Sequence, residues 1–381
     1  MKFLLIYVPN LRFSYKGDWS KRKLNEICLF FKGNGLSKSE LSNEGFPCIL
    51  YGELYTTYKN EVISDIISKT NTTLSNPFLS RNNDLIIPGS GEDPIDIAVT
   101  RAIYQNDIIL GGDLNILRPK SNVSAAFLSY QLNGVRRYDI AKKAQGKSIV
   151  HLHNSDLKEV LVSIPSYDEQ LHIVKLLTKI DEMIETQSKI INDYKLLKKY
   201  ITKSFIKQKG TSYLLSEIAE LGRGRVISSA EISKQKNPIY PVYSSQTSNN
   251  GVMGYLDNYD YEGEYITWTT DGANAGTVYY RNGKFNCTNV CGILKIKNGY
   301  DAYYISNILN CHTKKYVSTN LANPKLMNNV MANIKINLPS IERQKYFSNI
   351  LKAIEYRVKI EQDIKLNLAK QKVFLLKNMF L

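Results

Sequence analysis

The sequence predicts an α+β protein in which two mixed, mostly β globular units alternate with two long helices that form an antiparallel coiled coil within one chain. Three observations predict this fold. The stretch IPSYDEQ at residue 164 returns without a gap as LPSIERQ at residue 338, helical periodicity begins directly after each copy, and short β-branched runs precede each copy. The chain has 381 residues, which suits two to four domains.

The repeat extends well beyond these two stretches. HLHNSDLKEVLVSIPS (151–166) aligns with KLMNNVMANIKINLPS (325–340), AFLSYQLNG (126–134) with YYISNILNC (303–311), and RKLNEICLFFKGNGLS (22–37) with YLLSEIAELGRGRVIS (213–228). The period is far longer than the 20–50 residues of a helical solenoid. We therefore predict four parts: a globular unit over 1–164, a helix over 165–209, a second globular unit over 210–338 and a second helix over 339–381.

The globular units contain short strands and one short helix each. Runs bounded by Gly, Asn and Asp predict strands within 84–91, 107–110, 264–270 and 292–299. Short helices are expected at about 123–133 and 301–311, followed by strands around 157–164 and 332–338. Each last strand ends at a proline, Pro165 or Pro339.

The prolines mark the start of the long helices. Proline is tolerated in a first helical turn, Ser166 and Ser340 supply polar N-terminal side chains, and acidic residues follow in the first turn. Apolar residues then recur at spacings of four and three, which predicts two coiled-coil helices of roughly 60 Å. The expected pairing residues are Ile173, Leu177, Ile180, Ile184, Ile191, Tyr194, Ile201, Phe347, Leu351, Ile354, Val358, Leu368 and Leu375, flanked by Leu176, Ile190, Leu197, Ile350, Ile364 and Leu376.

Burying the two stripes against each other would give an internal pseudo-two-fold axis. Polar residues interrupt both stripes at equivalent places, with Gln187 matching Glu361 and Lys198 matching Lys372. Two interpretations are open: layers that set the register of the pair, or solvated positions at a local frame shift.

The composition favours a polyanionic partner without proving one. Fifty Lys and Arg against 35 Asp and Glu give a net charge of +15 and a pI of about 9.3. Codon bias is an alternative cause, because Lys, Asn, Ile and Tyr are all abundant. Five scattered Cys fit a reducing compartment, and no apolar run reaches 18 residues, so we expect a cytoplasmic protein with no membrane contact.

Motifs of common catalytic sites are missing. The sequence holds no GxxxxGK[ST] loop, no Pro-Pro of an amino-methyltransferase tetrapeptide and no Glu-x-Lys of a metal nuclease. His151 with His153, or Cys287, Cys291, Cys311 and His312, could be drawn as metal ligands, but strand-edge residues and ordinary thiols fit those spacings better. The chain is predicted to be non-catalytic and to hold no metal.

This order of parts resembles the DNA-specificity (S) subunit of type I restriction–modification systems. IPSYDEQLHIVKLLTKID and LPSIERQKYFSNILKAIE are similar to that family's hydrophobic-Pro-x4-Gln start of each conserved helix, and YKLLKKYITKSFI (194–206) and AKQKVFLLKNMFL (369–381) to its helix ends. LRFSYKGDWSKRKLNEI (11–27) resembles the family's N-terminal segment, and GFPCILYGELYTTY (45–58) one class of its recognition domains. Two departures are an apolar extension before Leu11 and the replacement of Leu196 and Leu197 by Lys370 and Gln371 in the second helix.

The resemblance implies a specific assembly. Each globular unit would be a target recognition domain that reads one half of a bipartite site in double-stranded DNA. The paired helices would set the spacing and dock two methyltransferase (M) subunits, which would bind S-adenosylmethionine and methylate adenine at N6. Restriction/motor (R) subunits would join separately, and this chain would hold no cofactor.

Candidate DNA-binding residues follow from loops that combine donors, acceptors and positive charge. Two such domains would meet one face of DNA about one turn, or ~34 Å, apart. In the first unit the candidates are Lys32, Asn34, Ser37, Lys38, Tyr51, Tyr55, Thr56, Thr57, Tyr58, Ser90, Asn115, Arg136, Arg137, Lys142, Lys143 and Lys147. In the second they are Arg223, Arg225, Ser244, Ser245, Gln246, Thr247, Asn249, Trp268, Thr269, Thr270, Asn274, Lys314, Lys315 and Asn320.

Plainer readings of the same features stay open. Each candidate also fits a solvated loop side chain, and Asn249-Asn250-Gly251 fits a turn. A coiled-coil adaptor that binds only proteins is the alternative function, and an enzyme with unrecognised motifs is a third class.

Overall fold

The computed structural model describes residues 9–15, 17–206, 208–318 and 323–380. The chain divides into two compact units, one formed by residues 1–188 with 363–381 and the other by residues 189–362. Both long helices pass from one unit into the other. No helix among the described residues is long and apolar enough to cross a membrane.

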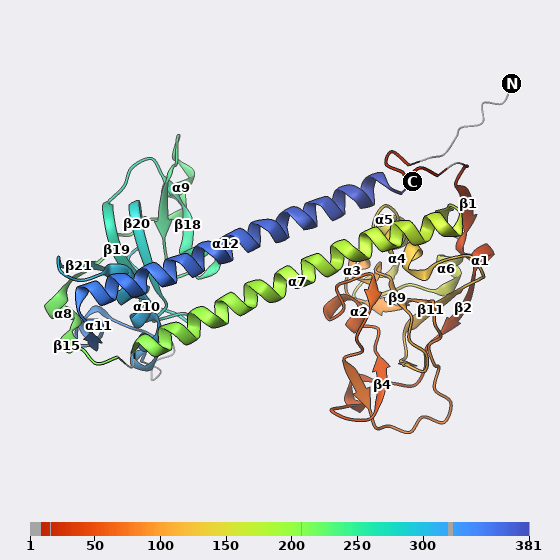
Figure 1. The fold of residues 1–381 in the computed structure, drawn as a ribbon, viewed down its shortest axis with the longest axis horizontal. Helices are drawn as coiled ribbons and strands as arrows, with labels where there is room; N and C mark the ends of the chain where they lie inside the picture. The colour runs from red at the N-terminus through yellow and green to blue at the C-terminus, as the bar shows by residue number, and fades with distance from the viewer. Residues whose placement is uncertain (1–8, 16, 207, 319–322, 381) are drawn as a thin grey trace. The chain divides into compact units, whose positions relative to one another are not determined.

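The first unit is built on a five-stranded sheet of order β2-β11-β7-β9-β5, of which Figure 1 labels β2, β11 and β9. Smaller sheets have the orders β10-β4-β6-β3, β12-β13-β8 and β1-β14. The strands are β1 Ser20–Lys23, β2 Cys28–Lys32, β3 Leu41–Ser42, β4 Phe46–Ile49, β5 Val62–Ile63, β6 Ser68–Thr70, β7 Asp84–Pro88, β8 Ser90–Gly91, β9 Arg101–Ile103, β10 Ile109–Leu110, β11 Leu114–Pro119, β12 Gln145–Gly146, β13 Val150–His151 and β14 Leu161–Ile164. The helices are α1 Leu24–Ile27, η1 Lys38–Glu40, α2 Glu53–Thr56, α3 Pro94–Ile97, α4 Ala125–Asn133, α5 Arg137–Ala141, α6 Asn154–Lys158 and the start of α7 Tyr167–Ile206.

The second unit has one six-stranded sheet of order β16-β21-β19-β20-β17-β18 and the pair β15-β22. Its strands are β15 Thr211–Leu214, β16 Ala219–Arg223, β17 Tyr240–Tyr243, β18 Val252–Leu256, β19 Tyr261–Thr269, β20 Val278–Cys287, β21 Cys291–Ile296 and β22 Lys335–Leu338. Its helices are α8 Leu215–Ile218, α9 Ser229–Ser233, η2 Ser248–Gly251, α10 Ala302–His312, η3 Thr313–Tyr316, α11 Asn328–Ala332 and most of α12 Ile341–Asn378.

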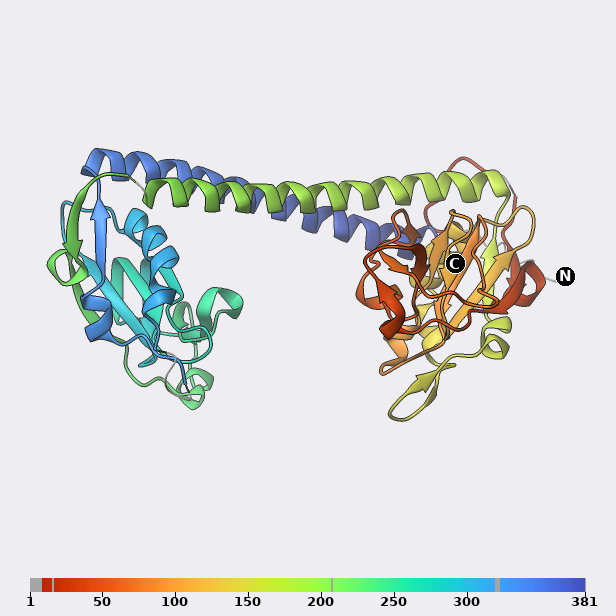
Figure 2. The same ribbon diagram turned by 90° about the horizontal axis from the view of Figure 1, so that it is seen from below.

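Each unit has the same three layers, which Figure 2 shows from a second side. In the first unit α4 packs between the five-stranded sheet and α7, where Phe127 and Tyr130 join Ile173 and Leu177 in one buried cluster. In the second unit α10 packs on β19 and β20, and Tyr304 stacks on Phe347 of α12 at 6.1 Å. The short helix of each repeat therefore couples its sheet to the long helices.

The repeated IPSYDEQ and LPSIERQ stretches perform the same structural task in both units. Gln170 is fully buried, accepts a hydrogen bond from the backbone N–H of Ser124 at 2.9 Å, and donates to the Pro165 carbonyl at 3.1 Å. Gln344 accepts from the Asp301 N–H at 3.0 Å and donates to the Pro339 carbonyl at 2.9 Å. Since Ser124 and Asp301 cap α4 and α10, this glutamine joins the short helix to the long one.

We expect Gln170→Leu to lower the free energy of unfolding by about 2–3 kcal/mol, because it leaves buried backbone groups without partners. Urea titration of the full chain measures this. Asn192→Leu is the matched control, since Asn192 is exposed on the same helix, and it should change stability by less than about 0.5 kcal/mol. Equal effects of the two substitutions would contradict the coupling role.

The predicted element types are confirmed, with shifted bounds. The long helices begin at Tyr167 and Ile341, two residues after each proline, because the Ser166 hydroxyl and carbonyl accept the first N–H groups of α7. The strands expected at 157–164 and 332–338 are shorter than predicted, since only residues 161–164 and 335–338 are strand. The first residues of each segment belong instead to the end of a one-turn helix, α6 or α11.

The long helices pack antiparallel in both units, as predicted. In the second unit the Phe205 and Phe347 rings stack at 3.6 Å, and Lys198 pairs with Glu355. In the first unit Lys372 of α12 contacts Asp181 of α7 at 2.5 Å. All the predicted pairing residues are buried or half-buried. Of the flanking residues, Leu197 and Ile364 are exposed, so the stripe is narrower there than predicted.

Three of the four polar residues that interrupt the stripes are largely shielded from solvent, whereas the Lys198 side chain is 30% exposed. Gln187 is 8% exposed and Glu361 is 3% exposed. The Glu361 carboxylate pairs with Arg357 one turn earlier at 2.6 Å. Lys372 reaches Glu61 at 2.6 Å as well as Asp181, and the Tyr130 hydroxyl donates to Asp181 at 2.7 Å. These residues therefore lie within the packed interface, which favours a role in setting the register.

Candidate nucleic-acid interface

Three loops of the first unit line a groove of about 780 Å³. The loops are those around η1, around α2 and before β11. The groove brings together six predicted residues: Ser37, Lys38, Tyr51, Tyr55, Thr56 and Thr57. Burial raises the pKa of Tyr55, so its phenol stays a neutral donor and acceptor. One lysine, three hydroxyl side chains and two tyrosines give this groove the mix of groups that reads base edges and phosphates.

The surroundings of the groove restrict some of these groups. Ser37 caps η1 and donates to Glu40 at 2.7 Å, while Glu53 accepts from the Leu50 N–H at 2.7 Å. Thr56 donates to the Gly52 carbonyl at 2.8 Å. Lys38 is exposed and is the cation that lines the groove.

Three predicted residues of this unit are buried, which corrects the prediction for them. Tyr58 packs in the core with its oxygen accepting from the Ile67 N–H, and Ser90 donates to Asp113 at 3.1 Å. Asn115 is fully buried and donates to the Leu152 carbonyl at 2.8 Å. Asn34 is exposed, but it bonds the backbone of Asn76 and Phe78 and so shapes the loop.

The remaining basic candidates of the first unit do not line the groove. Arg136 pairs with Asp139 at 3.3 Å, and Arg137 donates to the Ile95 carbonyl at 3.0 Å. Lys142 and Lys147 are exposed and Lys143 is half-buried, between α5 and β13. Lys32 is exposed at the end of β2.

In the second unit the loop over residues 244–251 carries the densest set of donors and acceptors. It holds Ser244, Ser245, Gln246, Thr247 and Asn249, all half-buried or exposed. The Ser244 N–H donates to the Gly251 carbonyl at 3.0 Å, and the Gln246 side chain donates to the Val252 carbonyl, so the loop is closed on itself. The predicted turn at Asn249-Asn250-Gly251 is confirmed by φ values of 47°, 54° and 83°.

Arginines near this sheet are held by carboxylates. Arg225 pairs with Glu231 at 2.7 Å and Asp260 at 3.1 Å, which raises its pKa. Arg223 lies 3.7 Å from Asp271. Asn274, Lys314 and Lys315 are exposed and remain available to a ligand, while Asn320 lies outside the described residues.

Trp268, Thr269 and Thr270 are buried, which corrects a second group of predictions. The Trp268 indole N–H donates to the Leu326 carbonyl at 2.9 Å, and its ring fills the space above Gly292. The last four residues of β19 are all buried, so both faces of the strand are covered there, and Thr270, directly after the strand, is buried as well. The hydrogen-bonding residue types in WTT did not indicate this burial.

A buried arginine was missed by the sequence reasoning. Arg281 of β20 is 4% exposed and lies against the rings of Tyr243 and Tyr279, with its guanidinium carbon 3.5 and 4.4 Å from the ring centroids. Burial lowers its pKa. The available signal was its place in YYRNGKF, where an arginine follows two tyrosines in a strand.

The suspected metal ligands have ordinary environments. His151 and His153 stack with ring centroids 6.1 Å apart. Cys287 and Cys291 are buried thiols; a hydrogen bond between them raises the pKa of Cys287 and lowers that of Cys291. Within the described ranges no three His, Cys, Asp or Glu side chains are placed to share a metal ion.

Comparison with known proteins gives this arrangement a family. The family model for the type I restriction modification DNA specificity domain matches twice, over residues 16–195 and 210–370. The chain belongs to this family. The two matches coincide with the two copies of the repeat, so each unit with its helix is one specificity domain.

Curated relatives from Mycoplasma pneumoniae agree with the family assignment. A putative type I specificity subunit N-terminus is 44% identical over 142 residues, covering 37% of this chain and 75% of that protein. Another putative type I specificity subunit is 36% identical over 216 residues, covering 54% and 80%. The type I restriction enzyme MpnII specificity subunit is 42% identical over 146 residues, covering 38% of this chain and 43% of the relative. The last of these relatives is thus matched over less than half of its length.

Solved structures share the fold at low sequence identity. The crystal structure of the type I restriction–modification system S subunit from M. genitalium superposes with a TM-score of 0.67, at 17% identity, covering 98% of this chain and 99% of that one. A chain from a study of complex assembly and conformational transition of the type I system gives a TM-score of 0.59, at 14% identity, covering 95% and 97%. The fold of specificity subunits is therefore preserved where most residues differ.

Proposed function

We propose that this chain is the non-catalytic DNA-specificity subunit of a type I restriction–modification complex and that each unit reads one half of a bipartite DNA site. The observation that carries the proposal is the double family match, one specificity domain in each unit. The first unit offers the groove around Lys38, and the second offers the loop 244–251. Because these two surfaces differ in chemistry, the two half-sites should differ in sequence.

The long helices suit a second task, the docking of two methyltransferase subunits. Large apolar side chains are exposed along α12 at Tyr346, Tyr356, Val373 and Phe374 and along α7 at Leu171 and Tyr200. Contiguous exposed apolar surface is typical of protein interaction sites, and we infer that these side chains contribute to such a surface. Tyr200 and Phe374 occupy the same position of the repeat, as expected if two identical partners bind.

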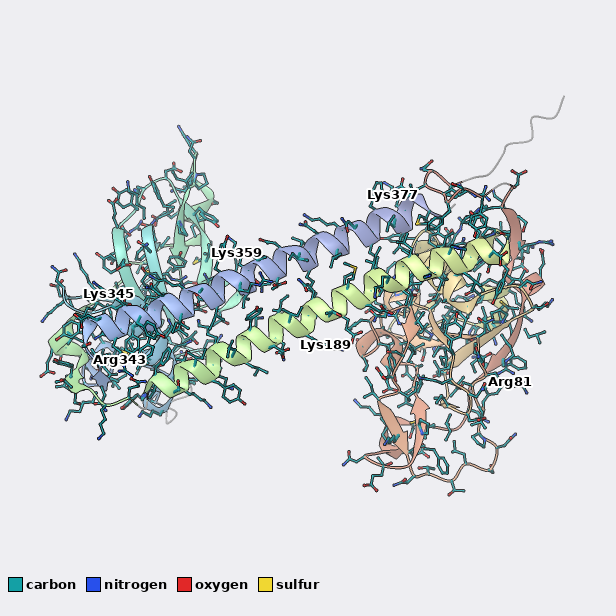
Figure 3. All side chains as sticks on the ribbon, in the orientation of Figure 1. Arg81, Lys189, Arg343, Lys345, Lys359 and Lys377 are labelled. Atoms are coloured by element: carbon teal, nitrogen blue, oxygen red, sulfur yellow. The ribbon has the colours of Figure 1, made fainter. Side chains whose placement is uncertain are left out.

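Basic residues accompany these apolar ones. Figure 3 labels Arg343, Lys345, Lys359 and Lys377, four exposed cations of α12. Residues 339–381 hold nine Lys and Arg against four Asp and Glu. This excess would add salt-dependent attraction to DNA or to an acidic partner surface. S-adenosylmethionine would bind to the methyltransferase subunits rather than to this chain, and motor subunits would join for restriction.

Co-expression of this chain with its methyltransferase subunit should produce N6-methyladenine within one asymmetric, bipartite motif. Sequencing the methylated bases of DNA from cells with and without the chain identifies the motif. Replacing residues 210–338 with the equivalent part of another specificity subunit should change one half of the motif and leave the other half unchanged. An assembled, active complex that methylates no defined motif would refute the proposal.

The alternative, an adaptor that binds only proteins, predicts a different result. The purified complex would then bind DNA no more strongly with this chain than without it. For the specificity subunit we expect DNA binding to weaken steeply as salt rises, because phosphate contacts release counterions. Binding measured at two salt concentrations separates the two functions.

A further inference from the structure

We propose that Arg281 is a positioning residue that holds the loop 244–251 in the shape that reads DNA. This inference rests on the proposed function and deepens it. Arg281 is buried, so it acts on DNA through the loop rather than by its own contact.

The guanidinium of Arg281 connects the sheet to the tip of the loop. Its Nε donates to the Thr267 hydroxyl at 3.2 Å, within β19. Its Nη2 donates to the Asn250 carbonyl at 3.0 Å. A planar guanidinium can make both bonds at once because its donors point in fixed directions, which a lysine ammonium on a flexible stem cannot reproduce.

Two tyrosines fix the plane of this group. Tyr243 is the residue immediately before the loop, and its ring centroid lies 3.5 Å from the guanidinium carbon. Tyr279 contacts it from β20 at 4.4 Å. Stacking against two rings restricts rotation of the Arg281 side chain, so its Nη2 donor has a defined position opposite the Asn250 carbonyl.

The loop needs this support because its backbone is unfavourable. Asn249 and Asn250 are both left-handed, a conformation that costs energy for residues other than glycine. Gly251 follows with φ of 83°, and a Cβ there would lie 3.1 Å from Nη2 of Arg281. The loop and the arginine are therefore fitted to each other without room for a side chain between them.

Among the described residues, no ion pair neutralises the charge of Arg281. No carboxylate among the described residues forms an ion pair with it; the ionisable groups that affect its pKa are Tyr243, Tyr279, Cys287 and Cys291. Burying such a charge is costly, and a neutral apolar residue would serve a β-strand core at lower cost. This cost of burying Arg281 has a functional reason if the arginine fixes the loop that recognises one half of the DNA site.

Arg281→Met should relax the half of the DNA motif that the second unit reads and leave the other half unchanged. We expect about a tenfold loss of discrimination against single mismatches in that half, within the range that one base pair contributes. The purified complex is allowed to methylate a DNA library in which both half-sites are randomised. Sequencing the methylated molecules gives the discrimination against mismatches in each half-site from one reaction. Arg281→Lys keeps the charge but cannot make both bonds, so it should change the same half-site by a smaller factor.

Lys284→Met is the matched control, because Lys284 lies on the same strand, is exposed and does not touch the loop. It removes the same charge and should leave both half-sites unchanged. Hydrogen exchange of the full chain should show faster exchange over residues 244–251 in Arg281→Met but not in Lys284→Met.

An unchanged motif in both Arg281 variants, with the wild-type complex methylating normally, would overturn the positioning role alone. If Arg281→Met does not fold, Arg281→Lys decides the question by the same criterion. If the wild-type complex itself methylates no bipartite motif, the proposed function fails instead.

Discussion

Lys372→Met is expected to lower the free energy of unfolding by about 3–5 kcal/mol, the largest stability effect of a single substitution that we predict for this chain. Lys372 is the cation of a buried cluster and contacts Asp181 at 2.5 Å and Glu61 at 2.6 Å. Methionine fills a similar volume but removes the cation that forms ion pairs with both buried carboxylates. Urea unfolding of the full chain at neutral pH measures the loss.

The same cluster gives the substitution a pH dependence. Burial raises the pKa of Asp181 above its ordinary value of 3.8, and Lys372 opposes that rise. A carboxyl group with a raised pKa stabilises the folded state most when it is protonated, and this stability is lost as pH rises through the folded pKa. Removing Lys372 raises that pKa further, so the variant should regain stability when the pH is lowered from neutral to mildly acidic.

Lys365→Met provides the control for Lys372→Met, because Lys365 is a half-buried lysine of the same helix for which no carboxylate partner lies among the described residues. It should change stability by less than about 0.5 kcal/mol at either pH. A destabilisation by Lys372→Met that does not depend on pH would show that the loss comes from packing and not from the unpaired carboxylates.

Phe380→Ala is expected to lower stability by about 3–5 kcal/mol through loss of aromatic packing. Phe380 is 4% exposed and its ring lies 5.3 Å from Phe127 and 6.4 Å from Trp19. Phe374→Ala is the matched control, because Phe374 is 60% exposed near the end of α12, shortly before Phe380 in the sequence. It should leave stability almost unchanged and, under the proposed function, weaken binding of the methyltransferase subunit.

Thermal or urea unfolding of both variants, followed by a binding assay with the methyltransferase subunit, separates the two roles. Phe380→Ala should reduce stability more than binding, and Phe374→Ala should do the reverse. If Phe374→Ala destabilised the isolated chain as strongly as Phe380→Ala, the assignment of an exposed docking surface would be wrong.

The fold was largely predictable because its evidence is periodic and repeated. Apolar residues at alternating spacings of four and three along 173–205 and 347–379 identified the buried faces of the long helices. The two copies of the repeat gave the same pattern independently. The role of the repeated glutamine was not predictable, since its partners are backbone groups of Ser124 and Asp301, some 40 residues away. The burial of Lys372 was likewise invisible, because its carboxylates come from two other elements.

The candidate interface was only partly predictable, because a run of hydrogen-bonding residues in the sequence does not determine which way each side chain points. Lys38 and Thr56 come to one groove, but Asn115 and Trp268 point inward from their strands to bond backbone carbonyls. Arg281 was missed for the opposite reason, because a single arginine in a strand carries no pattern. Its meaning depends on the Asn250 carbonyl, which only the folded loop brings to it.

The first unit includes residues from both ends of the described chain. The Leu11 N–H donates to the Asn378 carbonyl at 2.9 Å, and Trp19 shares a buried cluster with Met379 and Phe380. During synthesis this cluster therefore stays open until residue 380 has left the ribosome, long after the other contacts of the unit can form. A chain terminated early in the last helix would leave both units incomplete, with apolar surface exposed that favours aggregation or proteolysis of the truncated product.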